Sequence, residues 1–421
     1  MMKNIRLIHL LPLLAVLLLA NSGNLRAQAA AALPENDQCI ICHQEEEMMP
    51  ENINLADIHL QAGLSCAGCH GGDPTTNDEE AAMDPAKGFI GMPDKQDIPQ
   101  FCGKCHSDIT VMRQYQPRIA TDQVAQYYTS VHGQRLQAGD EKVADCTSCH
   151  TAHSIFSAKD PRSSVYALNV PGTCNHCHGD ADYMADYPIR HNQYEEYAAS
   201  VHGQALLENH DTGAPACNDC HGNHGATPPG IASVSHVCGT CHVNNMQYYA
   251  TTVMAREFEA EGIHGCEECH GYHSVEKTFD EMVGVGEKSV CMDCHEEGEE
   301  AYVQADSIYI HLSDLKAAYD SAATQQEVVR RIGMDDVEIG FLLQESHQSL
   351  IQARTLVHKF EAAAVGEKTS EGLGKAQEAL KLAYAQIEDA NVRRMGFGVA
   401  TLFITLLCVA LFLKIRDMEK Q

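Results

Sequence analysis

The sequence has no tryptophan, few aromatic residues and few basic residues. Phe and Tyr together make up 6% of 421 residues, so a large domain would have a poor core if side chains alone filled it. Lys and Arg number 29 against 58 Asp and Glu, which gives a formal net charge of −29. Because phosphate binding needs a basic surface, this balance argues against nucleic acid as a partner. A core material other than side chains is expected.

Long apolar runs are also scarce, and the first of two lies at the N-terminus. Residues 7–20 are apolar, follow Lys3 and Arg6, and precede small residues around Ala29. This order is typical of a secretory signal peptide, which we predict over residues 1–29. An uncleaved membrane anchor is the alternative.

The second apolar run, residues 395–413, is long enough at about 19 residues to cross a bilayer as a helix. We predict a transmembrane helix over 393–414 and a cytoplasmic tail over 415–421. Lys414 and Arg416 suit the cytoplasmic side under the positive-inside rule. The expected location is therefore the periplasmic side of the inner membrane, with a single C-terminal anchor.

The pentapeptide Cys-x-x-Cys-His occurs nine times and uses eighteen of the nineteen cysteines. Composition predicts only about 0.05 copies by chance, and the pentapeptide is the c-type haem attachment motif. A disulfide framework or zinc sites would use cysteines outside this spacing. Nine covalent c-type haems are expected, and they would supply the missing core. The predicted attachment residues are Cys39, Cys42, Cys66, Cys69, Cys102, Cys105, Cys146, Cys149, Cys174, Cys177, Cys217, Cys220, Cys238, Cys241, Cys266, Cys269, Cys291 and Cys294.

In each motif, two thiols on one helical turn can bond one haem, and the following histidine can bind its iron as the proximal ligand. These proximal histidines are His43, His70, His106, His150, His178, His221, His242, His270 and His295. The remaining cysteine, Cys408, lies in the predicted transmembrane helix, where packing or lipid contact explains it.

The haem region is internally repeated. Residues 128–134 and 200–204 share Ser-Val-His-Gly-Gln, and each copy precedes a motif with a further histidine three residues after the proximal one. A shortened copy, residues 263–265, and a degenerate first copy, with Asp73 at the +3 position, complete the pattern. The chain is interpreted as one lone haem at Cys39 followed by four two-haem units.

The repeat ranks the candidates for the sixth, distal iron ligand. Four histidines precede the first motif of a unit and three stand at the +3 position: His59, His132, His202, His264, and His153, His224, His273. A two-residue spacer cannot carry a +3 histidine around its own haem, so it must serve a neighbouring one. Further distal ligands are sought among His176, His191, His210, His236 and His311. His9, His347 and His358 are not expected to be ligands, and no methionine recurs with the repeat.

From about Ala301 the pattern becomes helical. Apolar residues at alternating three and four spacing predict helices around residues 308–322, 339–360 and 373–390, with breaks at Gly333 and near 366–374. We expect a nine-haem domain over 30–300 and a helical hairpin or stalk over 301–392. The hairpin would space the haem domain from the membrane, or its seam would support self-association into a homo-oligomer.

Through the nine motifs, the Val-His-Gly repeats and the +3 histidines, residues 37–312 resemble the multihaem c-type cytochromes of anaerobic respiration. The tail resembles the C-terminal helices of the octahaem hydroxylamine oxidoreductase and pentahaem nitrite reductase lineage. The resemblance implies a mainly helical fold with much irregular loop around stacked haems. It also implies histidine ligands on both faces of each iron, a periplasmic location and electron transfer.

The leading hypothesis is a membrane-anchored electron-transfer protein without catalytic residues of its own. It would pass electrons between a quinol-linked membrane partner, or another respiratory redox partner, and other cytochromes or outer-membrane acceptors. The alternative is an oxidoreductase of nitrite, hydroxylamine or tetrathionate at one five-coordinate haem. Against that, every motif ends in histidine, whereas the nitrite reductases carry lysine at the catalytic haem. A haem-storage protein would not need repeated cross-ligation.

Overall fold

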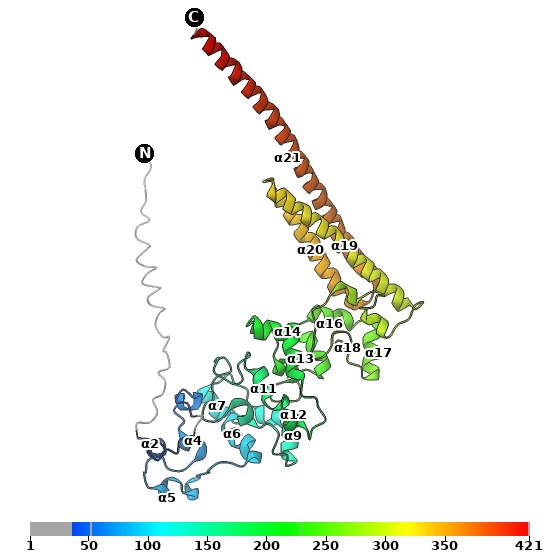
Figure 1. Cartoon of the computed structure of the whole chain (residues 1–421). Coiled ribbons are helices and arrows are strands. Elements are labelled where there is room, and N and C mark those ends of the chain that lie inside the picture. Colours follow the sequence, from blue (N-terminus) through cyan, green and yellow to red (C-terminus); the bar gives the residue numbers. More distant parts are fainter. Residues whose placement is uncertain (1–35, 51–52, 229, 420–421) are drawn as a thin grey trace, which may run out of the picture. The chain divides into compact units, whose positions relative to one another are not determined.

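A computed structural model describes residues 36–50, 53–228 and 230–419 (Figure 1). The predicted signal peptide, residues 1–29, and His9 lie outside these ranges. Across the described ranges the chain forms helices joined by irregular loops, without a β-strand. The mainly helical fold class is therefore confirmed. The chain divides into two compact units, residues 1–232 and 233–421.

The first unit contains the first six haem motifs on short helices. The linkers between haem pairs form short helices, α7 (Ile109–Tyr115) and α8 (Gln123–Tyr127) in one case and α12 (Ala181–Met184) and α13 (Gln193–Ala199) in the other. The elements are α2 (Gln38–Glu45), α3 (Ile58–Gln61), α4 (Cys66–His70), α5 (Glu79–Ala82), η1 (Pro85–Lys87), η2 (Lys95–Asp97), α6 (Ile98–His106), α7 (Ile109–Tyr115), α8 (Gln123–Tyr127), α9 (Val131–Gln137), α10 (Cys146–His150), α11 (Val170–His178), α12 (Ala181–Met184), α13 (Gln193–Ala199), α14 (Val201–Gly203), η3 (Gln204–Glu208) and α15 (Cys217–His221).

Side-chain cores in this unit are small, as the low aromatic content predicts. One cluster of buried residues consists of Tyr127, Leu136 and Val143, and another contains Val170, Leu206 and Ala216. Leu136 and Leu206 each stand four residues after the histidine of a Val-His-Gly repeat, so the two clusters are corresponding parts of the repeat. Clusters of this size leave haem as the main material that these loops can pack around.

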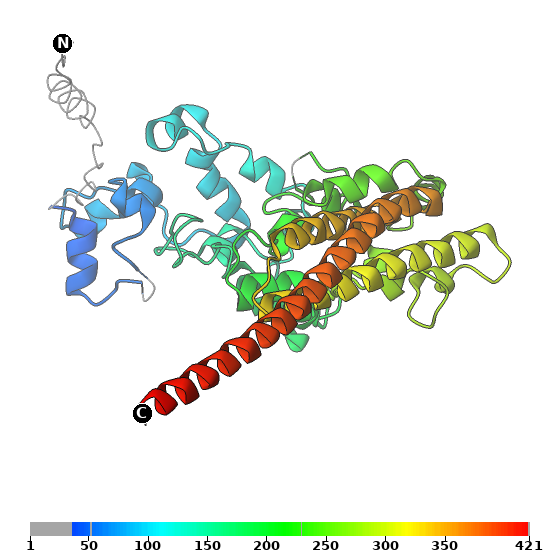
Figure 2. The same cartoon turned by 90° about the horizontal axis from the view of Figure 1, so that it is seen from above.

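The second unit contains the last three motifs and three long helices. Its elements are η4 (Val234–Thr240), α16 (Val243–Tyr249), α17 (Val253–Glu261), α18 (Glu267–His270), η5 (Asp280–Met282), η6 (Val290–Asp293), α19 (Glu300–Arg331), α20 (Val337–Leu356), η7 (Val357–Lys359) and α21 (Ala362–Met418). Figure 1 and Figure 2 both show α19, α20 and the first part of α21 lying side by side.

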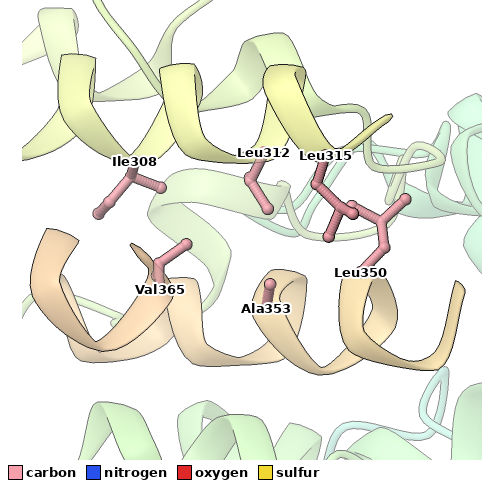
Figure 3. Close-up of a cluster of buried hydrophobic side chains, with 6 residues drawn as sticks. All are labelled: Ile308, Leu312, Leu315, Leu350, Ala353 and Val365. Carbon is pink, nitrogen blue, oxygen red and sulfur yellow. The ribbon is translucent and has the colours of Figure 1, made fainter. Parts of the chain in front are cut away.

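Two apolar clusters hold the three helices together. The first joins Ile308, Leu312 and Leu315 of α19 to Leu350 and Ala353 of α20 and Val365 of α21 (Figure 3). The second contains Val329, Ile339 and Leu343 with two fully buried alanines of α21, Ala379 and Ala383. The predicted seams are thus the buried faces of all three helices, because apolar side chains at this spacing share one side of a helix.

The structure confirms the predicted break at Gly333, whose φ is 73°, between α19 and α20, and corrects the one near 366–374. Helix α20 ends at Leu356, and the chain turns at Phe360, whose φ of 55° lies in the left-handed region. Helix α21 runs unbroken through the glycines at 366–374. These glycines permit close packing instead: a Cβ on Gly372 would lie 2.7 Å from the Ser349 Cβ, and one on Gly366 would lie 2.8 Å from the His311 Nε2.

The C-terminal half of α21 carries the predicted membrane span. Ala390 is its last buried residue, and every described side chain from 391 to 419 is exposed. Phe397 is 76% exposed and Phe403 is 69% exposed, which separates this stretch from the buried helix of a soluble core. Its length and composition fit a membrane-spanning helix, consistent with a C-terminal anchor.

Candidate haem-ligand sites

Most haem motifs occupy one turn of helix, as the chemistry requires. Helices α4, α10 and α15 consist of the five motif residues alone. Capping by Asp145, which accepts hydrogen bonds from the Thr147 and Ser148 N–H groups, starts α10 at its first cysteine. The motifs at Cys238 and Cys291 begin in the 3-10 segments η4 and η6, and their second cysteine and histidine follow the end of the segment.

The chain reverses directly after the first motif of each two-haem unit. The residue that follows the proximal histidine has a positive φ in all four units: 72° at Gly71, 64° at Thr151, 78° at Gly222 and 79° at Gly271. Glycine adopts this conformation without a steric penalty, which explains its presence at three of the four positions. This turn leads the +3 residue away from the haem of its own motif.

Five pairs of histidine rings face one another at nearly the same separation. Two imidazoles bound to opposite sides of one iron, each by an iron–nitrogen bond of about 2.0 Å, would have ring centres about 6 Å apart. The observed pairs therefore fit haem iron. They are His59 with His106 (6.0 Å), His70 with His153, His132 with His178, His150 with His224, and His270 with His358 (6.1 Å each).

Two of the pairs link different two-haem units, and two others lie within one unit. The +3 histidine His153 faces His70 of the preceding unit, and His224 faces His150 in the same way. His132 faces His178, the proximal histidine of the second motif after it. In both of the +3 pairs the +3 histidine faces the proximal histidine of a motif other than its own.

His358 lies in the same way opposite His270, although no pattern in the sequence predicts a ligand there. It lies in η7, between α20 and α21, far along the chain from the haem motifs. This geometry favours His358 as a ligand, against the expectation from the sequence. No repeat marks this histidine; the end of an apolar helix pattern beside it is the only signal in the sequence.

Hydrogen bonds orient several of these rings with Nε2 free. The Nδ1 of His358 lies 3.0 Å from the Thr355 carbonyl oxygen, and that of His70 lies 3.1 Å from the Ile90 carbonyl oxygen. Because a carbonyl only accepts, Nδ1 carries the proton and the Nε2 lone pair is available to iron. The Nδ1 of His59 lies 3.3 Å from the Asp57 carboxylate, and the Nδ1 of His295 lies 2.8 Å from the Glu299 carboxylate. These two rings are therefore also oriented with Nε2 available to iron.

Burial favours the neutral form that binds a metal. Desolvation lowers the pKa of His150, His224, His270 and His358. A neutral imidazole offers its lone pair to iron without first losing a proton.

Asp57 links two of the predicted distal ligands. Its carboxylate accepts hydrogen bonds from the His59 N–H at 2.8 Å and from the Ile155 N–H at 2.6 Å, and the His153 carbonyl accepts from the Asn54 N–H. Burial alone would raise the pKa of Asp57, but bonds from His59 and Ile155 outweigh it and lower that pKa. The segments that present His59 and His153 are thus held together.

Motif thiols of successive two-haem units lie next to one another. The Cys102 thiol lies in hydrogen-bond contact with the Cys146 thiol, and the Cys174 thiol contacts the Cys217 thiol. Burial raises the pKa of Cys149 to about 11, with a smaller contribution from Cys174. The Cys149 thiol is thus unlike a redox-active cysteine, whose pKa is lowered.

Two proximal histidines lack a facing ring. Within residues 36–50, 53–228 and 230–419, no second imidazole lies opposite His43 or His295. The predicted ligand His264 is exposed, and its ring lies 6.2 Å from that of Tyr272. The structure therefore does not bring His264 to a motif histidine.

The five further candidates also lie away from the described pairs. His236 bonds to Ser233, His311 packs on Gly366, and His176 lines a cavity with Thr173 and Tyr194. His191 and His210 are exposed. His202 and His273 stand at the repeat positions of His132 and His153 and remain predicted ligands.

Residues 58–179 match the model of the cytochrome c3 family. This stretch holds the motifs from Cys66 to His178 and three predicted distal ligands, His59, His132 and His153. No curated protein and no solved structure matches the chain. The matched family binds haem covalently and carries electrons, so the family match and the helical fold support a multihaem c-type cytochrome.

Proposed function

We propose that the chain binds nine c-type haems and relays electrons along them from a membrane-bound, quinol-linked donor to periplasmic or outer-membrane acceptors. The relay would serve anaerobic respiration on the periplasmic side of the inner membrane. The five histidine pairs at 6.0–6.1 Å carry the proposal, because each closes both faces of an iron to substrate.

Cross-ligation is the physical reason that this arrangement suits conduction. A haem bonded to one unit and ligated by the next, as with His70 and His153, holds the two units at a fixed separation. Electron tunnelling falls steeply with distance, so rigid neighbours conduct well. Imidazole on both faces in both redox states also keeps the reorganisation on electron transfer small.

The exposed apolar end of α21 supports the membrane side of the proposal. It would hold the haems close to a donor that is itself confined to the bilayer, which raises their encounter rate. The acidic surface, with a net charge of −29, would favour soluble partners with basic surfaces.

The test compares the full chain with a variant that ends at residue 392, both loaded with haem and counted by mass spectrometry. The vesicles contain a reduced quinone and the native membrane protein that oxidises it. In these vesicles the full chain should be reduced rapidly and the shortened chain slowly. Chemical reduction by dithionite should be equal for both. Equal reduction by the vesicles would refute the membrane-bound donor.

One observation favours a second candidate, chemistry on a small nitrogen or sulfur oxyanion at the haem of Cys39. The repeat would supply its distal ligand from the +3 position of the next unit, where Asp73 stands. Asp73 is engaged elsewhere: Lys87 Nζ lies 2.9 Å and Thr75 Oγ1 2.6 Å from its carboxylate. Hydrogen bonds from Thr75 and Lys87 lower the pKa of Asp73, which keeps it charged and bound there.

Turnover separates the two functions. With a reduced viologen as donor, nitrite, hydroxylamine and tetrathionate would each be consumed at a steady rate by an oxidoreductase. The relay proposal expects no turnover, even if one carbon monoxide molecule binds per chain at the Cys39 haem.

A further inference from the structure

Four helices begin in the same way, one before each two-haem unit. In each, a side-chain oxygen caps the helix, a β-branched residue follows, and the next residue occupies the second helical position. The cap bonds run from the His59 N–H to Asp57 (2.8 Å), from the Gly133 N–H to Ser130 (3.1 Å), from the Gly203 N–H to Ser200 (3.0 Å), and from the Ala255 N–H to Thr252 (3.0 Å).

The residue in the second helical position is the predicted distal ligand in three of the four helices. It is His59 in α3, His132 in α9 and His202 in α14. In α17 the same position holds Met254. The β-branched residue before it is equally exposed in α9 and α17: Val131 and Val253 are both 63% exposed.

A tyrosine three residues before the cap extends the match. The cap hydroxyl donates to the carbonyl of Tyr127 or Tyr197 at 2.6 Å, and Thr252 donates to the Tyr249 carbonyl at 2.8 Å. This aligns Tyr127, not Tyr128, with Tyr197.

The tyrosine ring then fixes the far end of the repeat. The Tyr127 hydroxyl donates to the Ala144 carbonyl, and the Tyr197 hydroxyl to the Pro215 carbonyl, at 2.8 Å each. Both acceptors stand two residues before the first cysteine of a motif. The Tyr249 hydroxyl packs on Gly265, and His264 takes the place of Ala144 and Pro215. His264 is therefore the loop residue of this copy, and Met254 is the counterpart of the ligand.

The observed pairs identify the haem that such a residue serves. His59 faces His106 and His132 faces His178, in each case the proximal histidine of the second motif after the helix. The second motif after α17 ends in His295, whose Nδ1 is bound to Glu299. We propose that the thioether sulfur of Met254 is the sixth ligand of the haem iron bound by His295, given the nine haems of the proposed function.

The consequence is one haem with a different potential. Methionine opposite histidine raises the reduction potential of a haem above that of two histidines. The segment η6 packs against α19. The haem bound there would be the first to accept an electron and the last to release one. Electrons would collect at this end of the array, beside the helices that lead to the predicted membrane span.

The experiment uses full-length protein with Met254→His, Met254→Ala and, as a control, Met92→Ala, a residue that is 94% exposed. The oxidised wild type should show the weak long-wavelength absorption of a thioether bound to low-spin ferric haem. In a potentiometric titration, one haem should be reduced above the rest. Met254→His should abolish the band and move that haem to the low-potential group. Met254→Ala should bind one additional carbon monoxide per chain, and Met92→Ala should match the wild type.

Haem content is counted by mass on the same samples. The ligand assignment would be overturned, and the relay left intact, by either of two results. One is a wild type with nine haems and no thioether band, and the other is a thioether band that persists in Met254→His. A mass that lacks the haem at Cys291 and Cys294 would overturn both proposals.

Discussion

Replacing His358 with alanine should open one haem of the array. The His270 and His358 rings are 6.1 Å apart with 26° between their planes, the arrangement of two ligands on one iron. His358→Ala removes one of them and leaves His270 and the thioether bonds in place. One haem in nine, or about 11% of the low-spin intensity in electron paramagnetic resonance, should then become high-spin. The same variant should bind one more carbon monoxide per chain than the wild type.

The matched control is His347→Ala. Both histidines belong to the helical region, and the sequence predicts neither as a ligand. The His347 ring lies 5.4 Å from that of Tyr319, within the bundle of long helices. Its loss should leave spin state and carbon monoxide binding unchanged. Unaltered low-spin intensity in His358→Ala, with wild-type carbon monoxide binding, would refute the assignment of His358 as a ligand.

Two further substitutions test the described histidines. Asp57→Ala removes the acceptor of three hydrogen bonds, at a cost of about 3 kcal/mol to the local fold. The His59 and His106 planes cross at 89° and should give a strongly anisotropic low-spin signal, which this variant should broaden while the other signals persist. Asp73→His restores the repeat at its first copy and should place an imidazole at the haem of His43. Carbon monoxide binding at that haem should disappear, and continued binding would show that the copy does not supply this ligand.

The sequence predicted those parts of the site that depend on local spacing. One helical turn fixes the two thiols and the proximal histidine together, so the motif identifies a haem without further knowledge of the fold. The +3 histidines were predictable for a similar reason, since the short spacer excludes their own haem. Both inferences needed only the reach of the chain.

The remaining parts depend on contacts between distant segments. His358 becomes a candidate ligand only when η7, the segment between α20 and α21, lies against α18, and no local sequence pattern predicts that contact. Gly366 and Gly372 were predicted as helix breaks because glycine is a poor helix former, but close packing between helices outweighs that preference. Met254 is not predicted from the histidine pattern, because the capping residue and the tyrosine, not a histidine, define this copy of the repeat.

The position of the last two-haem unit at the end of the array explains why its first haem would take a ligand, His358, from outside the repeat. His153 and His224 each face the first proximal histidine of the preceding two-haem unit. No further Cys-x-x-Cys-His motif follows His295 in the sequence, so no +3 histidine of a later unit can serve the first haem of the last unit. In the described structure His358 faces that haem's proximal histidine, His270, and Arg354 of α20 binds Asp280 through two bonds of 2.8 Å. With His358 as the ligand opposite His270, the helices after residue 300 would complete the haem array and would be more than a spacer between it and the membrane. A chain cut at residue 300 should consequently carry an open haem at His270.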